Sequence, residues 1–260
     1  MLDFKQITAK DNRLIKLVSL LQKSSKARKE NGLFVLEGLR ICKDAADNNI
    51  AFDVLILSKS VWEKSPAEIE PLKQNAASGA VVSDQLFAKI SDTATPQGIM
   101  AVCVMPRLKN ELDSHGRYVA LESVSDPANI GAISRTAEAL GVDGIIISGE
   151  SCDVYSPKAL RASMGTLLRM PLYFCEDIIE YLNSHALRGF ACIAQSNADL
   201  KIGEFKFSDG DVVIIGNEAN GLCDKTKLGA YKTVTIDMRG TAESLNASAA
   251  AAIAMWELKK

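Results

Sequence analysis

The chain of 260 residues is 47% hydrophobic and 6% aromatic, which is enough apolar material for one large or two medium domains. Its formal net charge of −2 excludes a global basic excess of the kind that indicates nucleic-acid binding, although a local basic patch is compatible with it. Two histidines and six cysteines without a CxxC pair disfavour a zinc site, and no apolar run has bilayer length. We therefore expect a cytoplasmic protein with reduced cysteines, no metal and no membrane span.

The first hundred residues alternate between helical and extended patterns. Leu14, Leu17, Val18 and Leu21 follow helical spacing, which predicts a helix over 11–22. Further strands are expected at 33–36, 52–57, 80–83 and 99–104, and further helices at 39–46, 66–76 and 84–90. This alternation indicates a small α/β domain over 1–105, and the polar stretch 106–117 is a candidate linker.

A basic segment, Lys23-Ser-Ser-Lys-Ala-Arg-Lys-Glu-Asn-Gly32, follows the first predicted helix. We expect a loop there. Its charge pattern fits a solvated connection and a phosphate-contacting loop equally well.

A second alternation runs from Tyr118 to the end of the chain. Strands are expected at 118–124, 144–148, 172–175, 190–194, 211–215 and 233–238, and helices at 126–140, from Ser156-Pro157 onward, at 176–186 and at 246–259. The run Asp211-Val-Val-Ile-Ile215 is continuously apolar after its first residue, which is typical of a strand buried on both faces. The sequence therefore predicts a second α/β domain over 118–260.

The final predicted helix begins with polar residues and continues into an alanine-rich run. Ser244 and Asn246 are candidate caps, because their side-chain oxygens can accept orphan backbone N–H bonds. A strand, a glycine and a polar helix start form ligand sites in α/β proteins, although an ordinary capped helix shows the same pattern. The alanines at 247, 250, 251 and 254 form one narrow face, which fits either packing on the chain's own sheet or an interface with a second copy.

Three loops that follow predicted strands carry the polar residues of interest: Asn129-x-Gly131-x-x-x-Arg135, Gly216-x-Glu218-x-x-Gly221-Leu222 and Ser244-Leu245-Asn246. The glycines permit close approach of backbone to a ligand, and a carboxylate after a buried strand needs solvation or pairing. The chain lacks the G-x-G-x-x-G fingerprint and the phosphate-binding loop of NTPases, which disfavours a nicotinamide oxidoreductase, an open-sheet methyltransferase and a P-loop enzyme.

Taken together and in this order, the segments 126–137, 215–222 and 244–248 resemble the three motifs of the SpoU/TrmH family, S-adenosylmethionine-dependent RNA 2′-O-ribose methyltransferases of the SPOUT superfamily. Ser156–Gly165 resembles the segment between these motifs. Phe34-Val-Leu-Glu37-Gly38-x-Arg40, behind the basic segment, more loosely resembles the family's RNA-binding domain, which is akin to a ribosomal-protein fold.

This resemblance implies a C-terminal SPOUT α/β domain with a deep trefoil knot and a smaller N-terminal α/β RNA-binding domain. It also implies S-adenosyl-L-methionine as cofactor, RNA as substrate and a homodimer. Ribosomal RNA is the favoured substrate and transfer RNA the alternative. A non-catalytic RNA-binding protein with the same fold is a further alternative.

The resemblance also implies residue roles. Arg135 would be the general base or the group that activates the ribose hydroxyl, and Asn129, Glu218, Ser244 and Asn246 would orient catalytic groups, RNA or cofactor. The cofactor would lie against Gly216, Asn217, Gly221, Leu222, Ile236, Met238 and Leu245. RNA would contact Lys26, Arg28, Lys29, Glu37 and Arg40. One departure is Asp237, which stands where the family usually has proline.

Overall fold

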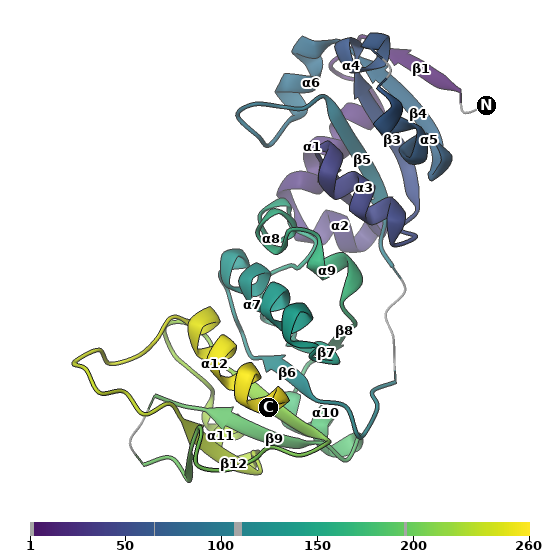
Figure 1. Cartoon of the computed structure of the whole chain (residues 1–260). Helices are drawn as coiled ribbons and strands as arrows, with labels where there is room; N and C mark the ends of the chain where they lie inside the picture. The colour runs from purple at the N-terminus through teal and green to yellow at the C-terminus, as the bar shows by residue number, and fades with distance from the viewer. Residues whose placement is uncertain (1–2, 65, 107–110, 195–196) are drawn as a thin grey trace. The chain divides into compact units, whose positions relative to one another are not determined.

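The computed structural model describes residues 3–64, 66–106, 111–194 and 197–260. By its internal contacts the chain forms two compact units, one of Met1–Arg107 with Tyr155–Leu168 and one of Leu108–Val154 with Arg169–Lys260 (Figure 1). Tyr155–Leu168 thus groups with the first unit, although the sequence suggested a second domain running unbroken from 118. Residues 107–110 of the predicted linker lie outside the described residues.

The first unit is built on a five-stranded sheet in the order β1-β4-β3-β5-β2. Its strands are β1 (Phe4–Ile7), β2 (Leu33–Glu37), β3 (Phe52–Ser58), β4 (Ala76–Val82) and β5 (Ile99–Val104). β5 runs antiparallel to both of its neighbours, and the other pairings are parallel. Its helical segments are α1 (Arg13–Lys23), α2 (Ser25–Asn31), α3 (Leu39–Asp47), α4 (Lys59–Lys64), η1 (Ala67–Ile69), α5 (Glu70–Gln74), α6 (Asp84–Ile90), α8 (Pro157–Ser163) and most of α9 (Thr166–Arg169).

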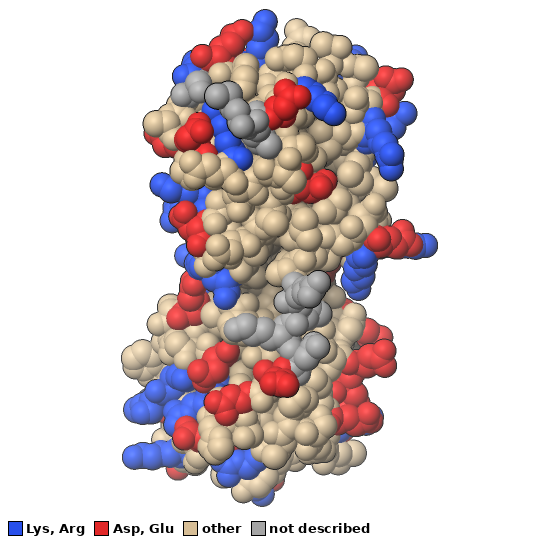
Figure 2. Space-filling model, turned by 90° about the vertical axis from the view of Figure 1, so that its right-hand side faces the viewer, with Lys and Arg blue, Asp and Glu red and all other residues tan. Residues whose placement is uncertain are grey.

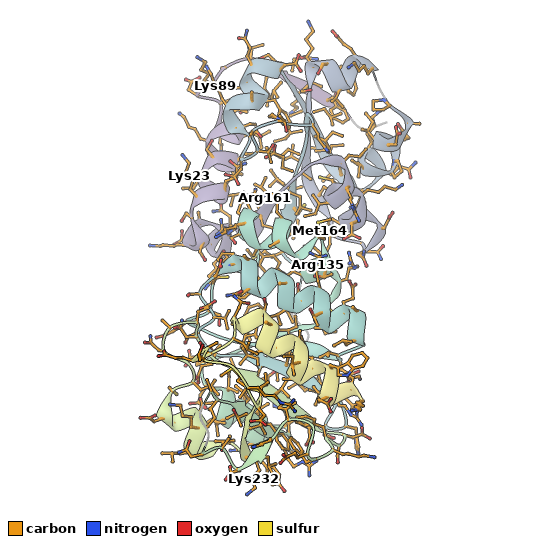
Figure 3. All side chains as sticks on the ribbon, turned by 60° about the vertical axis from the view of Figure 1, so that its left-hand side comes forward. Lys23, Lys89, Arg135, Arg161, Met164 and Lys232 are labelled. Atoms are coloured by element: carbon orange, nitrogen blue, oxygen red, sulfur yellow. The ribbon has the colours of Figure 1, made fainter. Side chains whose placement is uncertain are left out.

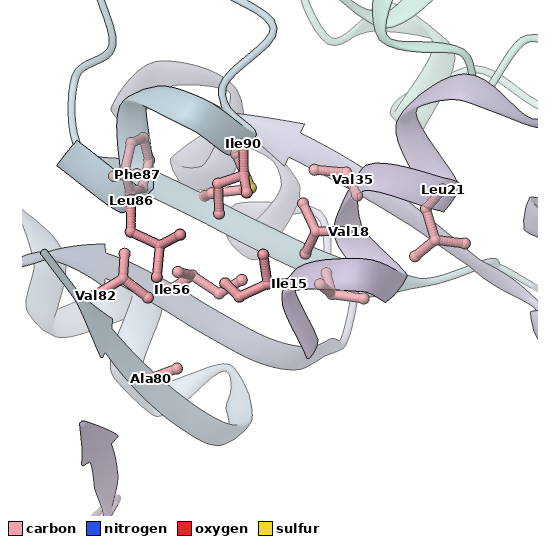
Figure 4. Packing of buried hydrophobic residues seen from close by; sticks show 12 residues of the cluster. Ile15, Val18, Leu21, Val35, Ile56, Ala80, Val82, Leu86, Phe87 and Ile90 are labelled. Atoms are coloured by element: carbon pink, nitrogen blue, oxygen red, sulfur yellow. The ribbon is translucent and has the colours of Figure 1, made fainter. Parts of the chain in front are cut away.

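One hydrophobic cluster of the first unit lies between this sheet and two of its helices (Figure 4). α1 contributes Ile15, Val18 and Leu21, which lie on one face at helical spacing. α6 contributes Phe87 and its apolar neighbours, and the strands supply branched side chains to the same cluster.

The basic segment after α1 is a helix, which corrects the predicted loop. The Ser24 hydroxyl caps α2 by accepting a hydrogen bond from the Ala27 N–H at 3.1 Å. Gly32 ends α2 with φ of 62°, a left-handed conformation that glycine adopts without a steric penalty. The prediction failed because a short run of charged residues is common in solvated loops. The Ser24 cap and the terminal Gly32 are the signals that indicate a helix here.

The second unit contains a seven-stranded sheet in the order β10-β12-β9-β11-β6-β7-β8, with every pairing parallel. Its strands are β6 (Tyr118–Leu121), β7 (Gly144–Ser148), β8 (Leu172–Cys175), β9 (Arg188–Cys192), β10 (Leu200–Lys201), β11 (Asp211–Ile215) and β12 (Lys232–Thr235). Its helices are α7 (Pro127–Leu140), α10 (Ile178–Ser184), α11 (Asp224–Gly229) and α12 (Ala247–Lys259). β11 is buried throughout, as its apolar run predicts.

The alanine face of α12 packs within its own chain, against α7 and β11; the yellow and teal helices lie side by side in Figure 1. Ala251 and Ala254 are fully buried there. The reading of this face as an interface is therefore wrong for Ala254. The large apolar residues that α12 leaves exposed are Ile253 and Trp256.

Candidate active site

The site begins where β6 and β11 end side by side. Because the two strands are parallel neighbours, their carboxyl ends lie at the same edge of the sheet. The loop after β6 leads into α7, where Asp126 caps the helix and Pro127 occupies its first position. The loop after β11 returns on itself, with Asn217 and Gly221 forming an isolated bridge.

The Glu218 carboxylate joins these two loops. One oxygen accepts hydrogen bonds from the backbone N–H of Asp126 at 3.1 Å and from the Asn129 amide at 2.8 Å. The other accepts from the backbone N–H and the hydroxyl of Ser125, at 3.2 and 3.0 Å. Glu218 therefore holds the start of α7 in place.

Asn129 extends this network to the third loop. The Asn246 amide donates to the Asn129 carbonyl oxygen at 3.0 Å, and the Asn246 oxygen accepts from the backbone N–H of Ser248 at 2.9 Å. Asn129 is buried, and both polar atoms of its side chain are hydrogen-bonded: the nitrogen donates to Glu218 and the oxygen accepts from Asn246. A chain of hydrogen bonds thus connects the three predicted motifs through Glu218, Asn129 and Asn246.

The pKa of the Glu218 carboxyl is lowered from 4.5 to about 2. Burial acts on it most strongly and would raise the pKa, but the hydrogen bond from Asn129 and those from nearby backbone N–H groups together outweigh burial. The carboxylate is thus an ionised anchor, unsuited to giving up or taking a proton near neutral pH.

A cavity of about 290 Å³ opens beside this network, at the carboxyl ends of β9, β11 and β12. All seven predicted cofactor residues line it, Gly216, Asn217, Gly221, Leu222, Ile236, Met238 and Leu245, together with Glu218 and Ser244. A methyl group at position 216 would lie 2.4 Å from the Gly221 carbonyl carbon, so only glycine fits between the two ends of the loop.

Arg135 lies on α7, two turns from its start, and its side chain is exposed (Figure 3). Within the described residues its guanidinium makes no hydrogen bond or ion pair, so its donors are available. Neither Arg135 nor Asn129 lines the cavity, and Asn246 also stands outside it. Asn129 and Asn246 meet the cavity indirectly, through the hydrogen bond to Glu218.

Sequence reasoning missed Ser125, and it named Asn217 as a cofactor residue without its role in folding the loop. The Asn217 oxygen accepts from the backbone N–H groups of Ala219 and Asn220, at 2.9 and 3.0 Å, and so shapes the loop after β11. Ser125 supplies two of the donors to Glu218. The signal for Asn217 was readable, since asparagine next to glycine commonly folds its own turn.

Asp237, at the position of the family's proline, is exposed and lies 3.6 Å from the Lys201 ammonium. This pair links the loop after β12 to β10. An exposed ion pair contributes little free energy.

The predicted RNA contacts of the first unit need two corrections. Arg28 is 4% exposed, and its guanidinium donates to the backbone oxygens of Leu21 and Gln22, so it joins α2 to α1. The Glu37 carboxylate accepts from the Asp92 N–H at 2.9 Å and from the Thr93 hydroxyl at 2.7 Å, which holds that loop. Both side chains are therefore committed to the fold.

The other three predicted RNA contacts lie at the surface. Lys26, Lys29 and Arg40 are exposed, and Lys26 is 3.8 Å from Glu30, which partly neutralises it. In the described parts of the chain, no cluster of side chains could hold a metal ion, and no helix combines the length and apolarity needed to cross a membrane.

The SpoU rRNA Methylase family model matches residues 116–256, and an MRM3-like substrate binding domain matches residues 12–101. The chain belongs to the SpoU rRNA methylase family. It is a methyltransferase, and its three motifs are the loops that meet at Glu218, Asn129 and Asn246.

Full-length relatives of this SpoU methylase are found among bacterial proteins. It is 30% identical to an uncharacterised tRNA/rRNA methyltransferase of Synechocystis sp., over 99% of this chain and 94% of the relative. It is 28% identical to the 23S rRNA (guanosine(2553)-2′-O)-methyltransferase RlmP of Bacillus subtilis, over 98% and 99%. The crystal structure of the AdoMet-bound rRNA methyltransferase from Sinorhizobium meliloti has a TM-score of 0.85 and 27% identity, over 98% of this chain and 97% of that one.

Proposed function

We propose that this chain transfers a methyl group from S-adenosylmethionine to a ribose 2′-hydroxyl of ribosomal RNA. The observation that carries the proposal is the cavity at the carboxyl ends of β9, β11 and β12, walled by the loop that Glu218 ties to α7. Family membership and full-length similarity to a 23S ribosomal RNA methyltransferase support the reaction and the substrate class.

The residues of the cavity fit such a cofactor. Its lining combines apolar side chains with backbone groups of the loops after β11 and β12, as ligand sites commonly do. The close passage of backbone at Gly216 keeps the two ends of this loop together beside the cavity. When bound, S-adenosylmethionine supplies a methyl group already activated on a sulfonium, so the protein needs to align the ribose oxygen and manage its proton.

Arg135 is the residue we assign to that oxygen. Its side chain is exposed, and its N–H donors are available. It belongs to α7, the helix whose start is held by Glu218. An arginine keeps its proton in proteins, so Arg135 would act by donating hydrogen bonds to the ribose oxygen, while the hydroxyl proton would pass to solvent water. Asn129, Glu218 and Asn246 would fix the position of α7 relative to the cavity, and positioning of this kind lowers a reaction barrier substantially.

A homodimer, a trefoil knot and a cytoplasmic location are parts of the same proposal. The dimer is supported by Ile253 and Trp256, whose exposed fractions are 38% and 60%. The knot is supported by family membership, which the resemblance of the three motifs first suggested. A chain trace through 193–246 in a crystal structure would test the knot.

The decisive test compares the wild type with Arg135→Ala. We expect the wild type to incorporate tritiated methyl groups into ribosomal RNA and Arg135→Ala to lose that activity, with thermal unfolding and calorimetric binding of S-adenosylmethionine nearly unchanged. Mapping of the methylated nucleotide distinguishes ribose from base. Variant activity within a few-fold of wild type would remove Arg135 from this role.

A further inference from the structure

α1 presents a basic stripe, defined as Arg13, Lys16 and Lys23 on this helix with Lys10 and Lys89 beside it. The three α1 cations and Leu20 recur at spacings of three, four and three residues, which places them on one side of the helix. All of them are exposed, whereas Ile15, Val18 and Leu21 on the opposite side are buried in the core.

The α6 side of the stripe is fixed by packing. The Gln22 side chain donates to the Ile90 carbonyl oxygen at 2.8 Å, which joins the last turns of α1 and α6. Lys89 immediately precedes Ile90, and in Figure 3 Lys23 and Lys89 project from the same side of this unit.

The cations of the stripe lack counter-charges among the described residues. α1 contains no acidic residue, and none of its cations forms an ion pair with a carboxylate of the described residues. The carboxylates in and next to α6 have other partners. Asp84, the first residue of α6, accepts from the Ser60 hydroxyl at 2.7 Å, and Asp92, after the helix, lies 2.6 Å from Arg161. Asp11, in the loop before α1, forms no ion pair with the stripe.

Two cations of the stripe also crowd each other. The pKa of Lys89 is lowered, first by hydrogen bonding with the Lys10 side chain and then by its charge. An anion bound between these two lysines would relieve that repulsion. The face of the same unit drawn in Figure 2 differs, because acidic and basic side chains are interspersed there.

The length of the stripe fits a nucleic-acid backbone better than a single anion. Ten residues separate Arg13 from Lys23, which corresponds to about 15 Å of helix, enough to meet several successive phosphates. A membrane surface fits less well, because the apolar face of α1 is buried and Leu20, 50% exposed, is the large apolar residue it leaves outside.

We propose that the basic stripe of α1 and α6 is the surface on which the first unit binds the phosphate backbone of the substrate RNA. This inference rests on the proposed function, and it moves the RNA contact from α2 and Glu37 to α1 and α6. Phosphate contacts position RNA without reading its bases, so the stripe would supply affinity rather than sequence specificity.

The test uses the full chain and a fluorescein-labelled transcript of 23S ribosomal RNA. One variant combines Arg13→Gln, Lys16→Gln, Lys23→Gln and Lys89→Gln, since glutamine keeps helix propensity and removes charge. A matched control combines Lys5→Gln, Lys43→Gln, Lys59→Gln and Lys64→Gln, which are exposed elsewhere on the same unit. Fluorescence anisotropy measures the dissociation constant between about 50 and 200 mM salt.

The stripe variant is expected to bind at least about tenfold more weakly at low salt and to lose about three from the log–log salt slope, since each phosphate contact on a single strand contributes about 0.7. The control is expected to stay within about twofold of wild type. Equal slopes for the stripe variant and the control would overturn the inference, as would stripe-dependent binding to phosphatidylserine vesicles without stripe-dependent binding to RNA.

The two proposals fail separately. A wild type that binds the transcript through the stripe but methylates no ribose would sink the proposed function alone. A wild type that methylates, with a stripe variant that binds RNA like the control, would sink this inference alone. Far-ultraviolet circular dichroism and thermal unfolding of both variants verify that the first unit, which carries all the substitutions, is folded.

Discussion

The Glu218 carboxylate makes a direct pH prediction at the scale of single residues. Its pKa in the folded chain is depressed from 4.5 to about 2, so the charged form is favoured by folding. Its contribution to stability is therefore present above the ordinary pKa and is lost as pH falls through about 2. We expect Glu218→Gln to lower the free energy of unfolding most near neutral pH, with the difference shrinking below about pH 4.5. Urea titrations across that range measure it. The control Glu243→Gln changes an exposed carboxylate without such bonds, and a pH-independent difference for Glu218→Gln would contradict the assignment.

Arg28 gives a second prediction at this scale, because it is buried and hydrogen-bonded to the end of α1. Removing it leaves backbone oxygens of Leu21 and Gln22 without their charged donor. We expect Arg28→Ala to lower the free energy of unfolding by about 2 kcal/mol, the usual scale for hydrogen bonds to a charged group.

The double variant Lys26→Gln and Lys29→Gln, on the exposed side of α2, should leave both stability and RNA affinity nearly unchanged. Strong loss of RNA affinity in that double variant would return the RNA contact to α2.

At the scale of elements, α12 has one buried face and one exposed face. Ala254 is fully buried against the chain's own α7 and sheet, so Ala254→Leu should overpack that contact and destabilise the folded chain by about 1–3 kcal/mol.

Trp256 is 60% exposed on the other face of α12. Trp256→Ala, combined with Ile253→Ser, should leave the monomer folded and shift sedimentation toward monomer, because a two-fold interface feels each substitution twice. A wild type that is monomeric at micromolar concentration while methylating RNA would end the dimer proposal.

At the scale of the whole molecule, the first unit is completed by a segment from later in the chain. The Tyr155 ring lies 5.0 Å from the Phe34 ring, α8 packs on β2, and Arg161 pairs with Asp92. We therefore expect a fragment ending at residue 106 to be less stable than the same residues in the full chain. Hydrogen exchange of β2 amides in the two proteins measures this, since exposing Phe34 weakens the packing on that strand. Equal protection of the β2 amides in the fragment and in the full chain would mean that Tyr155–Leu168 does not stabilise the first unit.

Local pattern was enough to predict much of the site. Alternating strands and helices gave the α/β class, and the apolar run before Gly216 gave a strand buried on both faces. Asn246 was expected to cap α12 and does so, because capping depends on neighbours within one turn. The residues lining the cavity were predicted through the family's motifs, and they meet because parallel strands end at one edge of the sheet.

Tertiary structure decided what depends on residues far apart in sequence. Arg28 is an exposed cation by composition, yet the packing of α2 on α1 buries it. The partners of Glu37 lie more than fifty positions away, at Asp92 and Thr93, and no local pattern points to them. The spacing of the α12 alanines is compatible with packing inside the chain and with an interface between two copies. The contact of α12 with α7 in the folded chain decides for internal packing. Periodicity tells which residues share a face, while the contact that covers the face is set by the long-range order of the strands and helices.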